Sequence, residues 1–177
     1  MQDTSAFYAA LSAYAAPAAV AAALVAVWLQ NRTAKRLLGF QLFAQVAAQY
    51  DSQDMRLVRS RLANTLLADR ASQHIDETLL VHFENVGVLV RRKLIDRDLV
   101  WNIYSYDVPR YWLALFDYVQ AARNVYDPSL YEEFENLAKW LRSKKRSPMG
   151  TPLVYREVTA DDLLDFLRSE GKRGIEH

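Results

Sequence analysis

The fold of this chain is decided first by residues 6–29, which read AFYAALSAYAAPAAVAAALVAVWL. These 24 residues carry no charge, and 12 of them are alanine. At about 1.5 Å of rise per residue, such a helix is roughly 36 Å long, whereas the hydrocarbon core of a bilayer is about 30 Å thick. The segment therefore predicts one transmembrane helix within an N-terminal anchor, residues 1–31. The alternative is an alanine-rich helix buried inside a soluble domain.

The charges on either side of this segment predict its orientation. Asp3 precedes the apolar run, whereas Arg32, Lys35 and Arg36 follow it. A secretory signal peptide has the opposite order, with positive charge before its apolar core. Because positive charge collects on the cytoplasmic side of membranes, we expect the N-terminus outside and the remaining chain in the cytoplasm.

Alanines repeat at helical spacing within the same segment. Small residues four apart allow the backbone of a second helix to approach closely in lipid, which favours lateral association with a partner or with a second copy. Alanine is also simply a good helix former, and this reading stays open. The repeats form two rows: Ala15, Ala19 and Ala23, and Ala18, Ala22 and Ala26.

The composition narrows the class of protein. The 177 residues include 22 basic and 21 acidic side chains, for a net charge of +1, and no cysteine. Bulk binding of nucleic acid needs a basic surplus that this chain lacks, so nucleic acid is an unlikely partner. Disulfides and Cys-ligated zinc are excluded. With only five glycines and five prolines, the composition favours helices.

Residues 32–146 predict a cytoplasmic bundle of about five to six helices, into which the N-terminal helix continues. Residues 147–177 predict an irregular segment followed by a short C-terminal helix. Apolar periodicity and capping residues give the helix positions. The expected helices run from Arg32 to Tyr50, from Ser52 to about Asp69, from Ile75 onward, from Asp96 to Tyr104, from an Asp107 cap, from Asp127-Pro128, and from Thr159 to a closing Gly171.

Three charged residues lie beside apolar stripes on helices expected to pack together. They are Glu84, Arg123 and Glu135. We expect Arg123 to pair with one or both glutamates across the core, because a buried carboxylate needs compensation. Gly87 lies beside the same buried face and would permit close helix crossing. These roles are structural.

No catalytic or metal motif is present. The three histidines occur outside any His-Glu-x-x-His pattern, and neither a phosphate-binding glycine loop nor a Gly-x-Ser-x-Gly elbow occurs. The basic segment Arg142–Arg146 is typical of a helix C-terminus, where cations complement the dipole, although contact with anionic lipid is an alternative. We therefore predict no catalytic residues, no cofactor and no metal.

Three segments resemble a family of small bacterial proteins of unknown function. They are FENVGVLVRRKLIDRDLVW, YWLALFDYVQAAR and YEEFENLAKWL, and the resemblance covers approximately residues 56–141. Members of this family have an N-terminal membrane helix followed by an all-helical domain. The resemblance implies a helical protein of the bacterial inner membrane, and it brings no established activity.

Together these observations predict a non-enzymatic accessory or scaffolding subunit of a membrane assembly, or a protein-interaction module that self-associates. Its partners would be the lipid bilayer and another protein. The second hypothesis is a regulatory or defence-type sensor that binds a nucleotide, lipid or nucleic acid through an arginine-rich face. That face would comprise Arg56, Arg59, Arg61, Arg91, Arg92 and Lys144. An enzyme is the third option, and it would require a deep pocket with convergent polar groups.

Overall fold

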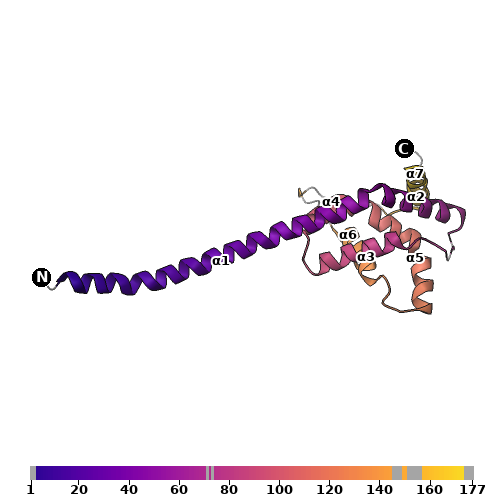
Figure 1. Cartoon of the computed structure of the whole chain (residues 1–177). Coiled ribbons are helices and arrows are strands. Elements are labelled where there is room, and N and C mark those ends of the chain that lie inside the picture. The colour runs from indigo at the N-terminus through magenta and orange to yellow at the C-terminus, as the bar shows by residue number, and fades with distance from the viewer. Residues whose placement is uncertain (1–2, 71, 73, 145–148, 151–156, 174–177) are drawn as a thin grey trace. The chain divides into compact units, whose positions relative to one another are not determined.

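The computed structural model describes residues 3–70, 72, 74–144, 149–150 and 157–173. Within the first helix it describes the side chains of residue 20 and of residues 23 onward. The described residues form seven α-helices and no strand, which confirms the predicted all-α class (Figure 1). The chain divides into two compact units, residues 1–39 and residues 40–177. This division lies eight residues beyond the boundary expected after residue 31.

The first helix, α1 (Asp3–Asp51), contributes to both units. Most of the segment predicted to span a membrane, Ala6–Leu29, lies outside the residues whose side chains are described. Among the residues that are described, no helix is both long enough and apolar enough to cross a bilayer. The part of α1 in the second unit joins the core through Phe43 and Tyr50, which are buried.

Helix α7 (Ala160–Arg173) packs mainly on α2 (Gln53–Ala68) and so belongs to the same compact unit as the bundle. Ser52 caps α2, because its hydroxyl accepts a hydrogen bond from the Met55 amide at 3.2 Å. Thr159 and Asp162 form a capping box at the start of α7, with reciprocal bonds of 3.1 and 3.0 Å. Both helix starts were expected.

The predicted end of α7 is wrong. Gly171 lies inside the helix, which continues to Arg173. Its role is close packing, because a Cβ at this position would lie 2.6 Å from the side-chain oxygen of Asn64 on α2. The hydroxyl of Ser60 also donates to the Gly171 carbonyl at 2.8 Å. The glycine therefore marks a helix contact, and sequence reasoning mistook it for a helix stop.

The other part of the bundle is built from four helices: α3 (Thr78–Arg91), α4 (Arg97–Tyr104), α5 (Asp107–Val125) and α6 (Glu132–Ser143). α4 lies where a short helix from Asp96 to Tyr104 was expected, and Asp96 is its cap, accepting from the Asp98 amide at 2.7 Å. α5 begins at Asp107, but the residue in the cap position is Tyr106, which makes no side-chain capping bond.

The start of α6 differs from the expected Asp127-Pro128. The carboxylate of Asp127 accepts a hydrogen bond from the Ser129 amide at 2.8 Å, which makes a local turn. The chain then passes through Tyr131 in the left-handed region, with φ of 57°, and the helix starts only at Glu132. Asp-Pro therefore begins a turn here, and the helix starts five residues later.

The core is rich in aromatic side chains. Four of them are fully buried: Phe83, Phe134, Tyr104 and Tyr111. The ring centroid of Phe83 lies 5.1 Å from that of Phe134 and 5.8 Å from that of Tyr111. Such tilted ring pairs stabilise beyond the area they bury. Phe83 and Phe134 belong to the buried sides of α3 and α6. Phe116 on α5 is 44% exposed.

Gly87 allows α3 and α6 to cross at short distance. A Cβ built on Gly87 would lie 2.4 Å from the carbonyl oxygen of Glu133 on α6. This neighbour is backbone, so the helices themselves would have to move apart.

We predict that Gly87→Ala destabilises the bundle by about 1–3 kcal/mol, despite the better helix propensity of alanine, because overpacking forces a backbone shift. The measurement is urea denaturation followed by tryptophan fluorescence. Val81→Ala, on the exposed side of the same helix, is the control and should lie near the wild type. A Gly87→Ala variant as stable as the wild type would contradict the close crossing.

Candidate functional site

The six basic residues of the predicted arginine face differ in how well they could bind an anion. Arg59 is 4% exposed. Arg91 pairs with Glu133, and Lys144 pairs with Asp98 at 2.6 Å. Arg56 is half-buried, whereas Arg61 and Arg92 are exposed. Three of the six are therefore already compensated by acidic groups or buried, which weakens the hypothesis of one anion-binding surface.

Arg59 lies at the centre of a buried polar network. Its Nε is 3.5 Å from a carboxylate oxygen of Glu170 on α7, and its Nη1 is 3.8 Å from a carboxylate oxygen of Asp107 on α5. The guanidinium also lies over the ring of Tyr50 on α1, 4.3 Å from its centroid. Sequence reasoning missed this role, because Arg59 sits between two more exposed arginines and was grouped with them on the predicted arginine-rich face.

Two tyrosine hydroxyls complete the network. Tyr50 donates to Asp107 at 2.5 Å, and Tyr111 donates to Glu170 at 2.7 Å. Burial, followed by the charge of the neighbouring carboxylate, raises the pKa of both phenols well above the ordinary tyrosine value. The phenols therefore stay protonated and act as donors. The network links α1, α2, α5 and α7.

His82 lies beside this network in the core. It is 4% exposed, its Nε2 is 3.2 Å from the Tyr104 hydroxyl, and its ring stacks on Tyr50 with 5.5 Å between centroids. Burial, with a contribution from the positive charge of Arg59, lowers the pKa of His82 to about 4. The imidazole is therefore neutral at pH 7. Among the described residues, no group of three or more potential metal ligands occurs.

Of the two glutamates expected to pair with Arg123, the structure brings Glu135 to it and gives Glu84 other partners. Arg123 donates to Glu135 at 2.7 Å and to the Leu130 carbonyl at 2.8 Å. Glu84 has another function: its carboxylate accepts the backbone amides of Glu133 at 3.3 Å and Phe134 at 2.8 Å. These amides lie in the first turn of α6, where N–H groups lack helical partners. Glu84 therefore caps α6 from a different helix.

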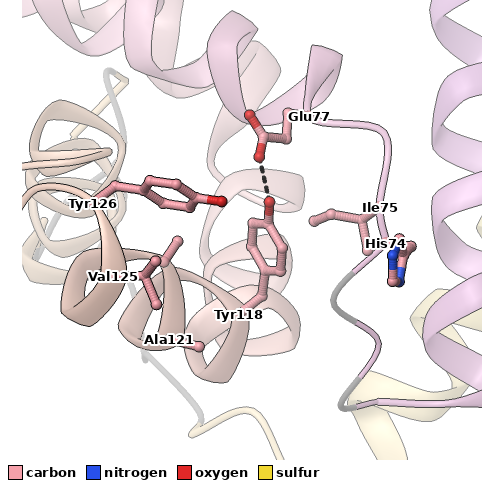
Figure 2. Close-up of a pocket in the computed structure, with 8 residues that line it drawn as sticks. His74, Ile75, Glu77, Tyr118, Ala121, Val125 and Tyr126 are labelled. Carbon is pink, nitrogen blue, oxygen red and sulfur yellow. Dashed lines mark hydrogen bonds between the residues drawn. The ribbon is translucent and has the colours of Figure 1, made fainter.

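An open hollow of about 600 Å³ lies between the segment before α3 and the second half of α5 (Figure 2). Figure 2 shows the carboxylate of Glu77 hydrogen-bonded to the hydroxyl of Tyr118 at the edge of the hollow. Glu77 accepts hydrogen bonds from Tyr118 and, at 2.7 Å, from Tyr131. The residues that line the hollow are His74, Ile75, Glu77, Tyr118, Ala121, Ala122, Val125 and Tyr126.

The electrostatics of the hollow follow from this arrangement. Burial, and then the hydrogen bond and charge of Glu77, raise the pKa of Tyr118 and of Tyr131 above the ordinary tyrosine value. Both phenols therefore remain neutral donors to the carboxylate. Sequence reasoning did not single out this site, because Glu77 lies 41 and 54 positions from its two partners and no local motif joins them.

The residues predicted to act in the membrane segment are only partly described. Ala23 and Ala26 are exposed, whereas the side chains of Ala15, Ala18, Ala19 and Ala22 lie outside the described residues. The basic residues Arg32, Lys35 and Arg36 are exposed. The guanidinium of Arg32 lies 5.4 Å from the ring centroid of Trp28.

Comparison with known proteins gives one match. A family model described as a domain of unknown function, DUF4760, matches residues 4–142, which is most of the chain. The match ends at the C-terminal part of α6 and leaves α7 outside it. We found no curated protein and no solved structure that matches the chain.

We predict that His82 makes the stability of the bundle depend on pH between about 6.5 and 4. The unfolded chain takes up a proton at its ordinary pKa, near 6.5, while the folded chain resists protonation down to about 4. The contribution of neutral His82 to the free energy of unfolding is therefore fully present above pH 6.5. It falls as the pH drops towards 4, by about 3 kcal/mol in total.

The test compares urea denaturation of the wild type and of His82→Gln at several pH values. Glutamine keeps a polar side chain but does not titrate, and all carboxylates remain common to both proteins. The stability difference between the two should change by about 3 kcal/mol across this range. Parallel pH profiles would contradict the buried neutral imidazole.

Proposed function

This chain is a member of DUF4760, a domain-of-unknown-function family, and from that premise we propose that it is a membrane-anchored, non-enzymatic protein-interaction module. In this proposal its N-terminal helix spans the inner membrane of a bacterium, with the N-terminus outside. The helical bundle lies in the cytoplasm and binds partner proteins. The protein acts as an accessory or scaffolding subunit of a membrane assembly, or as an anchor that self-associates.

The observation that carries the proposal is an exposed apolar run in α1. The large apolar side chains described between Val20 and Leu29 are 50–66% exposed. Leu24, Val25 and Trp28 belong to this run, and neighbouring positions on a helix point in different directions. A helix that is apolar on all sides is stable in a protein core or in lipid. Because the chain itself leaves these side chains uncovered, lipid is the environment that suits them.

The charges beside this run support the proposed orientation. Arg32, Lys35 and Arg36 are exposed and follow within one to two helical turns of Leu29. Such a cluster is retained on the cytoplasmic side of a membrane. Trp28 at the end of the run suits the headgroup layer, where amphipathic rings are enriched.

The small residues of the same helix support a partner within the membrane. Ala23 and Ala26 are exposed, and each continues a row of alanines spaced four apart in the sequence. Close backbone approach along such a row is how membrane helices associate without a hydrophobic driving force. The partner is either a second copy of this chain or another membrane protein.

An interaction role also fits the buried polar groups of the bundle. Arg59, His82 and Glu170 are all less than 5% exposed; Arg59 lies beside Glu170, His82 contacts Tyr104, and Glu170 also pairs with Arg173 at the surface. These groups serve to hold helices together, because a substrate would have no access to them.

We predict that Val20→Arg combined with Leu24→Arg moves the full-length protein from the membrane to the soluble fraction of bacterial cells. Each arginine within the apolar run costs about 2.5–3.5 kcal/mol near the bilayer centre. The measurement is fractionation, followed by extraction of the membranes with alkaline carbonate.

The matched control places two arginines on the bundle instead, at Val81 and Leu94, which are also exposed apolar positions. This control should remain with the membranes. If the wild type itself is extracted by carbonate, the anchor proposal is wrong.

The partner is tested by purification of the full-length chain in a mild detergent, beside a chain that lacks residues 1–30. We expect one stoichiometric membrane protein, or a second copy of the chain, to copurify and to be lost with the deletion. Mass measurement identifies the composition. A monomeric full-length chain would contradict the scaffolding role, while leaving the membrane anchor intact.

A further inference from the structure

We infer that the hollow beside Glu77 binds a small organic ammonium cation. This inference concerns the bundle alone and does not rest on the proposed membrane anchor. It is carried by the side chains that line the hollow and by the orientation of the carboxylate at its edge (Figure 2).

The first step is the sign of the charge. Among the described residues that line the hollow there is one carboxylate, Glu77, and no lysine or arginine. The Tyr118 and Tyr131 hydroxyls each donate to a different oxygen of this carboxylate. These bonds come from neutral donors, so they fix the direction of the carboxylate without neutralising its charge, which can attract a cation. The hollow therefore favours a positive ligand.

The second step is the aromatic wall. Figure 2 shows the rings of Tyr118 and Tyr126 on neighbouring sides of the hollow, with the Tyr126 hydroxyl directed towards Tyr118. Tyr126 is 81% exposed and follows α5 directly, so its ring face is accessible. The face of an aromatic ring attracts a cation within about 6 Å of its centroid. Carboxylate and rings together are the combination that recognises alkylated ammonium groups.

The third step distinguishes an organic cation from a metal ion. Ile75, Ala121 and Val125 supply apolar surface to the hollow, which methyl or methylene groups of a ligand can cover. Calcium and magnesium instead require about six oxygen ligands. The described residues contain no group of three or more acidic or histidine side chains that could supply a metal site. A volume of about 600 Å³ suits a small molecule.

The test uses choline as the probe and 3,3-dimethylbutan-1-ol, its neutral isostere, as the matched ligand. Binding is measured on the full-length protein in a maltoside detergent, which carries no ammonium group, by saturation-transfer NMR and calorimetry. We expect saturable binding of choline, and at least about tenfold weaker binding of the neutral isostere, because only the charge differs.

Two variants test the residues. Glu77→Gln should weaken choline binding by about tenfold or more, and Tyr126→Leu by several-fold. Tyr126 is almost fully exposed, so its replacement tests the site even if Glu77→Gln impairs folding. The control, Asp165→Asn, removes one negative charge from an exposed position on α7 and should bind choline like the wild type.

Two outcomes would overturn the inference. One is equal binding of choline and of its neutral isostere, which would show that the hollow recognises shape without charge. The other is no saturable binding of choline up to about 10 mM, a concentration that corresponds to a negligible affinity. Either result would leave the membrane proposal untouched, because that proposal is tested by fractionation.

Discussion

The burial of Arg59 is the constraint on which the bundle depends. Removing a guanidinium from water costs several kcal/mol unless opposite charge and hydrogen bonds compensate it. Here the compensation comes from Glu170 on α7, Asp107 on α5 and the ring of Tyr50 on α1. Each lies on a different helix, so all three groups surround Arg59 only when all four helices are in their native positions. A purely apolar core would tolerate more arrangements of the same helices.

Local signals in the sequence predicted where most helices begin. Ser52 and the pair Thr159 and Asp162 cap their helices because capping involves only neighbouring residues. The same logic failed at Asp127, since an aspartate before proline can start a turn as readily as a helix. The true start of α6 is stabilised by Glu84, 49 and 50 positions away from the amides that it accepts, which no local pattern reveals.

The candidate sites were harder to predict than the helices, for the same physical reason. Glu77, Tyr118 and Tyr131 meet only after α3, α5 and α6 have packed, and none carries a motif by itself. Arg59 reads as a surface residue because its sequence neighbours are exposed or half-buried arginines. Arg123 could be placed beside Glu135 because apolar stripes on both helices indicated that they pack together.

The position of α7 has a consequence for the order of folding during synthesis. The family match ends at residue 142, yet Glu170 of α7 supplies one of the two carboxylates that face Arg59. Until α7 has emerged from the ribosome, Arg59 lacks the carboxylate of Glu170, and the face of α2 that packs on α7 is exposed. The core is therefore complete only after α7 has been synthesised. A polypeptide that ends before α7 would leave that face of α2 in water and Arg59 with one carboxylate instead of two.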